Sequence, residues 1–141
     1  MSLVVDSSMA LAWYFDDERS DESTTVLRRL AGESAVVPAI WPLEVANGLQ
    51  MAVRRGRITG EYRDASLNDL RSLPIEIDSE TNDRAWTATL ALAVRLRLTM
   101  YDAAYLELAL RRRLPLATFD QELVRAARSE RVELIQTTNS A

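Results

Sequence analysis

The chain has 141 residues, a hydrophobic share of 48% and a formal net charge of −4, which is typical of one globular domain with a core of its own. It contains no histidine, cysteine or lysine, which excludes serine–histidine–aspartate triads, thiolate metal sites, Schiff-base lysines and P-loop lysines. Any catalysis must use carboxylates, hydroxyls, arginines or a bound ion. The negative charge disfavours a sequence-independent nucleic-acid coat but permits a metal nuclease, because metal ions can bridge acidic ligands to phosphate.

The first predicted element is a strand at 3–5, an apolar run that ends abruptly at Asp6, Ser7 and Ser8. A short run of branched residues without alternation is typical of a strand buried on both faces in a parallel sheet. Asp6 would then emerge at the carboxyl edge of the sheet, where open α/β folds bind their ligands.

The rest of the chain alternates further short apolar runs with segments of helical spacing. Ser7 or Ser8 is expected to cap the first helix, and the acids between 16 and 22 indicate a solvated turn before the second. After the first strand, the predicted elements are helices at 9–15 and 23–31, a strand at 35–37, helices at 40–55 and 60–73, an edge strand at 75–77, helices at 80–98 and 102–112, a strand at 114–117, a helix at 120–129 and a strand at 132–135. The apolar positions of helix 80–98 are Ala85, Trp86, Leu90, Ala93, Val94 and Leu96.

This order predicts a three-layer α/β/α fold with a five-stranded parallel sheet and right-handed crossovers. The chain has no internal repeat and no linker, so we expect a single domain over 1–141 whose polar tail at 136–141 is frayed. No apolar stretch is long enough to span a bilayer, and no export signal opens the chain. These features predict a cytoplasmic protein without a membrane partner.

Four carboxylates far apart in the sequence are predicted to meet at the carboxyl edge of the sheet. Asp6 ends the first strand, Glu44 lies in the first turn of helix 40–55, and Asp102 and Asp120 open later helices. Singly, Asp102 and Asp120 are typical helix caps, and Glu44 could complement a helix dipole. Asp6 is harder to explain in this way, because a buried charge is costly unless it is paired.

Together, the four acids should repel one another and raise each other's pKa. Without lysine or histidine, the simplest neutralising partner is a cation or an arginine. Oxygen ligands suit Mg²⁺ and Mn²⁺, and such an ion can activate water and stabilise charge on a phosphodiester.

Four motifs, LVVDSSMALAW, PLEVANGL, MYDAAYLELAL and ATFDQEL, resemble in order and rough spacing those of PIN-domain ribonucleases, and more narrowly of the VapC-type toxins of bacterial toxin–antitoxin pairs. YDAAYLELA is the most specific of these motifs, and the resemblance extends over nearly the whole chain. It implies the strand order 3-2-1-4-5 and an endoribonuclease site that depends on Mg²⁺ or Mn²⁺. The family's four acids match Asp6, Glu44, Asp102 and Asp120, and its hydroxyl residue matches Thr118.

The resemblance also implies an RNA substrate, a homodimer and an antitoxin that covers the acidic groove. Trp13, Tyr101 and Tyr105 are interpreted as packing residues rather than as platforms for RNA bases. The alternative function is a catalytically silent PIN-like scaffold that binds RNA or a protein partner. Haloacid-dehalogenase phosphatases and phospho-receiver domains fit less well because both require a lysine, and dinucleotide enzymes require a glycine fingerprint that the first turn lacks.

Overall fold

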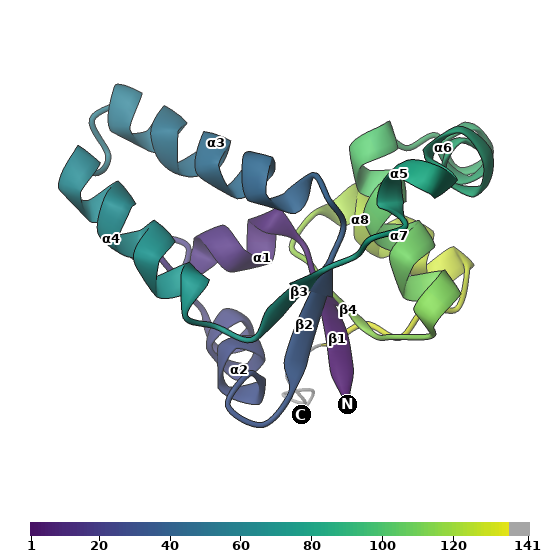
Figure 1. The fold of residues 1–141 in the computed structure, drawn as a ribbon, viewed down its shortest axis with the longest axis horizontal. Helices are drawn as coiled ribbons and strands as arrows, with labels where there is room; N and C mark the ends of the chain where they lie inside the picture. The colour runs from purple at the N-terminus through teal and green to yellow at the C-terminus, as the bar shows by residue number, and fades with distance from the viewer. Residues whose placement is uncertain (136–141) are drawn as a thin grey trace.

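The computed structural model describes residues 1–135, so the tail predicted at 136–141 lies outside the described residues. A central parallel sheet separates two groups of helices, with α1–α4 on the left of Figure 1 and α5–α8 on the right. The strands are β1 (Ser2–Val5), β2 (Ser34–Val37), β3 (Ile75–Ile77) and β4 (Leu116–Ala117). The helices are α1 (Ser7–Ala12), α2 (Asp21–Arg29), α3 (Trp41–Arg54), α4 (Gly60–Arg71), α5 (Thr81–Arg84), the π-helical turn η1 (Ala85–Thr89), α6 (Leu90–Leu96), α7 (Met100–Arg112) and α8 (Gln121–Ser129). This arrangement confirms the predicted three-layer α/β fold.

The strand order is β3-β2-β1-β4 with every pair parallel. Val4 of β1 pairs with Val36 on one side and with Leu116 on the other, so β1 is a central strand, as predicted. The predicted fifth strand is reduced to a single parallel bridge between Leu134 and Leu116. That segment still follows β4 in space, so the predicted order is correct, while the sheet formed by residues 1–135 has four full strands.

Local side-chain caps define where most of the helices begin. Each capping side chain accepts a hydrogen bond from a backbone N–H in the first turn, which satisfies a group that the helix itself leaves unpaired. The capping residues of α1, α2, α4, α7 and α8 are Asp6, Ser20, Thr59, Thr99 and Asp120. The expectation that Ser7 or Ser8 caps α1 is therefore wrong, and Asp6 takes that place.

The helix predicted at 80–98 is interrupted by the π-helical turn η1. A π turn holds one extra residue and so shifts the register of the apolar face that follows it. Thr89, Leu92 and Ala93 are buried, whereas Trp86 and Val94 are 89% and 73% exposed. Of the six apolar positions of this helix, Trp86, Leu90 and Val94 therefore lie at the surface and not on the packed face.

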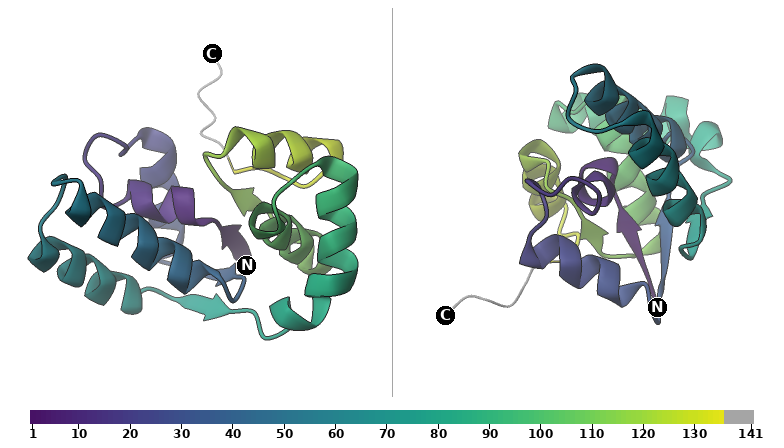
Figure 2. Two further views of the ribbon diagram at one scale, coloured as in Figure 1. Left: turned by 90° about the horizontal axis from the view of Figure 1, so that it is seen from above. Right: turned by 90° about the vertical axis from the view of Figure 1, so that its left-hand side faces the viewer.

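Helix α7 has more buried residues than any other helix of residues 1–135, and it packs against both β1 and β4. The two views of Figure 2 show α6 and α7 on the opposite side of β1 from the α3–α4 hairpin. The first turn of α7 and the first turn of α3 therefore approach the end of β1 from opposite sides.

Within residues 1–135, none of the helices combines the length and the apolar character that crossing a bilayer requires.

Candidate active site

Asp6 lies where β1 ends and α1 begins, and its side chain is held by a ring of donors. The residue is 4% exposed. Its carboxylate accepts the backbone N–H of Met9 at 2.9 Å, the hydroxyl of Ser8 at 2.8 and 3.0 Å, and the hydroxyl of Thr118. This buried carboxylate is thus satisfied by neutral donors and not by an opposite charge.

The pairing of β1 with β4 brings the turn after β4 onto Asp6. The backbone N–H of Asp6 donates to the carbonyl of Ala117 at 3.1 Å, which places Thr118 next to Asp6. Thr118 Oγ1 accepts the N–H of Asp120 at 3.0 Å, and Ser8 Oγ accepts the N–H of Phe119 at 3.0 Å. Two hydroxyls therefore fasten the β4–α8 turn to the Asp6 carboxylate.

The other three predicted acids lie at the starts of helices near this turn. Asp120 caps α8 by accepting the N–H of Leu123 at 3.0 Å. Asp102 is in the first turn of α7, which is capped by Thr99 and not by Asp102 itself. Glu44 is in the first turn of α3, and its Oε1 accepts the hydroxyl of Tyr105 at 2.5 Å.

The pKa values show that these carboxylates interact electrostatically with one another. Burial raises the pKa of Asp6 to about 6 against the opposing effect of its hydrogen bonds, and the charge of Asp120 adds to the rise. Burial, followed by the charges of Asp120 and Glu44, raises the pKa of Asp102 to about 6. Burial, the hydrogen bond to Glu44 and the charges of Glu44 and Asp6 also raise the pKa of Tyr105. The five side chains form one electrostatic cluster.

No arginine neutralises this cluster in the part of the chain that the structure describes. The ion pairs of residues 1–135 include none of the four carboxylates. Carboxylate and hydroxyl oxygens without a cationic partner are a donor set that suits a hard divalent cation. In the same residues, however, no three Asp or Glu side chains already converge on one ion position. Binding would require side-chain rotations that bring the acids together.

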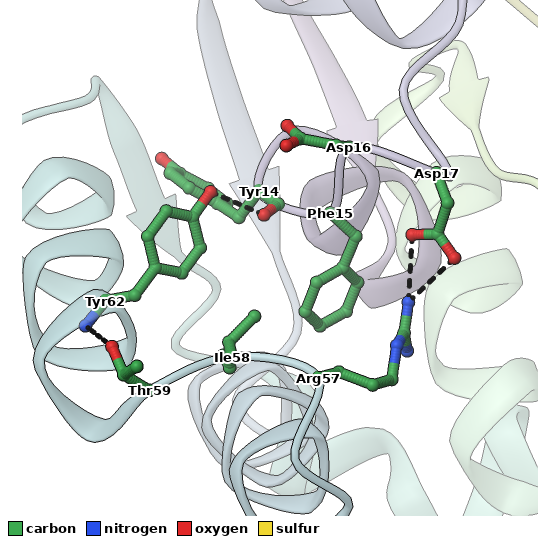
Figure 3. Close-up of a pocket in the computed structure, with 8 residues that line it drawn as sticks. All are labelled: Tyr14, Phe15, Asp16, Asp17, Arg57, Ile58, Thr59 and Tyr62. Atoms are coloured by element: carbon green, nitrogen blue, oxygen red, sulfur yellow. Dashed lines mark hydrogen bonds and ion pairs between the residues drawn. The ribbon is translucent and has the colours of Figure 1, made fainter.

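A separate pocket of about 550 Å³ contains none of the four carboxylates in its lining. It opens between the segment after α1 and the α3–α4 turn, and Figure 3 shows the eight residues around it. Its single cation, Arg57, lies 4.5 Å above the ring of Phe15 and pairs with Asp17 and Glu18. With its charge already paired and no member of the carboxylate cluster in its lining, this pocket is a weaker candidate for catalysis.

Two contributors to the cluster were not identified from the sequence. The sequence predicts for Ser8 only a capping role, and its one further signal is that a hydroxyl stands two residues after Asp6. The sequence predicts that Tyr105 is a packing residue, and Tyr105 is indeed buried, but its hydroxyl also donates a hydrogen bond to Glu44. The signal for Tyr105 was its position three residues after Asp102, which places both side chains on one face of a helix.

We expect the metal-free protein to lose stability as pH rises from about 4 to about 6. The pKa of both Asp6 and Asp102 rises from 3.8 to about 6 on folding, so in this window the folded state binds more protons than the unfolded chain. The pKa values of Asp78 and Glu130 are lowered, so their contributions to the free energy of unfolding change at a lower pH than this window.

Urea unfolding with chelator, at about pH 5 and about pH 7.5, measures this difference in the free energy of unfolding. In Asp6→Asn, which has no carboxyl proton to gain at this position, the difference should shrink. An unchanged difference in that variant would contradict the assignment of the raised pKa to Asp6.

Comparison with known proteins places this geometry in context. The PIN domain family model matches residues 3–129. A protein named Ribonuclease VapC3 from Mycobacterium tuberculosis (strain ATCC 25618 / H37Rv) is 36% identical over 109 residues, which cover 76% of this chain and 75% of that protein.

Two solved structures share the fold at lower identity. The crystal structure of VapBC2 from Rickettsia felis bound to a promoter DNA fragment aligns with a TM-score of 0.68 and 15% identity, covering 95% of this chain and 97% of that one. A toxin–antitoxin complex from Klebsiella pneumoniae aligns with a TM-score of 0.57 and 18% identity, covering 84% and 86%.

Proposed function

Since this chain belongs to the PIN domain family and within it to the VapC-type ribonucleases, we propose that it is a metal-dependent endoribonuclease acting as the toxin of a toxin–antitoxin pair. The observation that carries the proposal is the carboxylate cluster at the end of β1. Burial and the charges of neighbouring acids raise the pKa of Asp6 and of Asp102, and no arginine of residues 1–135 pairs with any of the four acids. A site of this charge would repel a phosphodiester unless a cation were bound there as well.

Asp6, Asp102, Asp120 and Glu44 would hold one or two Mg²⁺ or Mn²⁺ ions, some through water. A bound ion would supply charge neutralisation and a more acidic water. Thr118 and Ser8 orient the Asp6 carboxylate through their hydroxyls, and they hold the turn that carries Asp120 against it. This preorganised arrangement lowers the cost of assembling the site.

The proposed reaction is a hydrolytic displacement at phosphorus. The water oxygen forms a bond to phosphorus while the bond from phosphorus to the leaving sugar oxygen breaks. An ionised carboxylate of the cluster accepts the proton of the attacking water, and the leaving oxygen takes up a proton. No covalent enzyme intermediate is needed, which agrees with a chain that has neither histidine nor cysteine.

Cleavage of RNA should require a divalent cation. Purified protein incubated with structured RNA and Mn²⁺ is expected to produce discrete fragments, resolved on a denaturing gel. Excess chelator should abolish the fragments, and excess Mn²⁺ should restore them. Asp102→Asn, purified in the same way, controls for a contaminating nuclease. Cleavage that persists in chelator would contradict the metal requirement, and binding of RNA without cleavage would favour the scaffold alternative.

The proposed partner is a cognate antitoxin protein. The Klebsiella pneumoniae structure that shares this fold is a toxin–antitoxin complex, which supports an antitoxin as the natural inhibitor here. An antitoxin segment that covers the carboxylate cluster would block access of RNA to it.

We further propose that the protein forms a homodimer through an apolar stripe on η1 and α6. Trp86, Leu90 and Val94 follow one another at four-residue spacing and are all exposed. Exposed apolar residues in a contiguous patch are typical of an interface, and a second copy can bury such a stripe symmetrically. Light scattering is expected to give twice the 15.9 kDa chain mass, and Val94→Glu should return the protein to monomers. A monomeric wild type at high concentration would contradict this proposal.

A further inference from the structure

Tyr105 joins two helices that carry different acids of the candidate site. It lies on α7 three residues after Asp102, and its side chain is among the largest that are fully buried. Its hydroxyl donates at 2.5 Å to Oε1 of Glu44, a residue of α3 that is 61 positions away in sequence. The contact therefore connects the first turn of α3 directly to the second turn of α7.

Burial gives this hydrogen bond its importance. A phenolic hydroxyl removed from water needs a partner, and the structure provides a carboxylate as that partner. Glu44 is only half-buried, and it makes no other side-chain hydrogen bond within residues 1–135. Without Tyr105, the torsions of Glu44 would be restrained by packing alone.

The bond uses one carboxylate oxygen of Glu44 and leaves the other without a protein partner in the described residues. The charge of Asp6 also contributes to the raised pKa of the Tyr105 hydroxyl, so this hydroxyl interacts electrostatically with a second acid of the cluster. A residue that holds one oxygen of a ligand while the second oxygen remains available is a typical orienting partner of a metal site.

We propose that Tyr105 is a positioning residue that holds Glu44 through Oε1 so that Oε2 can bind the divalent cation. This inference rests on the proposed function, and it assigns Tyr105 a role beyond packing in the core. The hydroxyl does not contact the reacting atoms. It acts through Glu44, because the hydrogen bond limits the side-chain conformations that Glu44 populates before the ion binds. Fewer conformations are then lost on binding.

Isothermal titration of metal-free protein with Mn²⁺ tests the inference without any RNA. Tyr105→Phe keeps the ring and removes the hydroxyl, so it should weaken Mn²⁺ binding by about tenfold. Tyr14→Phe is the matched control, because the Tyr14 hydroxyl also donates to a carboxylate, that of Asp69 at 2.6 Å, far from the cluster. Tyr14→Phe should leave the Mn²⁺ affinity unchanged.

A double-mutant cycle separates positioning from general damage to the fold. If Tyr105 acts through Glu44, then Tyr105→Phe should have no further effect on Mn²⁺ affinity once Glu44→Gln is present. Equal effects in both backgrounds would overturn the inference. So would a Glu44→Gln variant that binds Mn²⁺ as tightly as the wild type, and this result does not depend on whether Tyr105→Phe folds.

The outcomes distinguish this inference from the proposed function. A wild-type protein that binds no Mn²⁺ would overturn the metal-dependent mechanism and this inference with it. Wild-type binding together with an undisturbed Tyr105→Phe variant would overturn the role of Tyr105 alone. Weakened binding that is confined to backgrounds with Glu44 intact would support both.

Discussion

Asp6→Asn is expected to lower the rate of metal-dependent RNA cleavage by about a thousandfold. Losses of this size are typical when one group that stabilises charge in a transition state is removed. Asparagine keeps the shape of the side chain and an oxygen that can cap α1. It removes the charge that would hold a cation where β1 ends. Initial rates with saturating Mn²⁺ provide the measurement, and Asp83→Asn, an exposed acid on α5, is the matched control.

The same substitution should not destabilise the metal-free protein at neutral pH. Burial raises the pKa of Asp6 to about 6, so its ionised form costs stability in the folded state. The corresponding free energy is roughly 2–3 kcal/mol, and asparagine does not incur it. We expect unfolding of Asp6→Asn in chelator to need as much urea as the wild type or more. A strong loss of stability would mean that the carboxylate serves the fold and not the site.

Arg111→Ala is expected to destabilise the protein by about 3–5 kcal/mol, because it leaves two buried acids unpaired. Arg111 contacts Asp78 at 2.6 Å and Glu107 at 2.8 Å, and the side chains of both acids are almost inaccessible to water. Burial pushes the pKa of Asp78 upward, but the hydrogen bonds from Arg111, Thr81 and the backbone of Glu80, together with the charge of Arg111, outweigh burial, and the pKa is lowered. This carboxylate is therefore charged in the folded state and depends on its partner.

The neighbouring Arg112 is the matched control for that experiment. It pairs with Glu76 at 2.9 Å, but the two side chains are 36% and 59% exposed. Exposed pairs contribute at most about 1 kcal/mol, so Arg112→Ala should shift the urea midpoint only slightly. Equal losses in the two variants would contradict the view that burial makes the Arg111 network important. That network joins α7 to the start of α5 and so supports the helix that carries Asp102 and Tyr105.

Much of the candidate site follows from local sequence and from rules of parallel sheets. A short run of branched residues predicts a central strand, and the residue after it must lie at the carboxyl edge. The structure confirms this prediction for Asp6, because β1 has neighbouring strands on both sides and the β4–α8 turn reaches the end of β1. The positions of Glu44, Asp102 and Asp120 in first turns or caps follow from the same strand-helix alternation.

Other features depended on partners that are remote in the chain. The hydroxyl of Thr118 meets Asp6 across 112 residues, and Tyr105 meets Glu44 across 61. Periodicity cannot reveal such contacts, since it states which face of an element is apolar but not which element that face meets. The packing of η1 and α6 against α7 is likewise a tertiary feature, and it leaves Trp86 and Val94 exposed although both are apolar.

The sequence by itself determined the chemistry that is possible, the alternation of strands and helices, and which acids lie at one edge of the sheet. These depend on residue type and local spacing, because strands and helices have fixed periods. Only the tertiary structure decided that Asp6 is buried among neutral donors, that burial raises the pKa of Asp6 and of Asp102, and that Tyr105 donates a hydrogen bond to Glu44. Burial and distance set these properties, and both arise when segments far apart in the chain pack together.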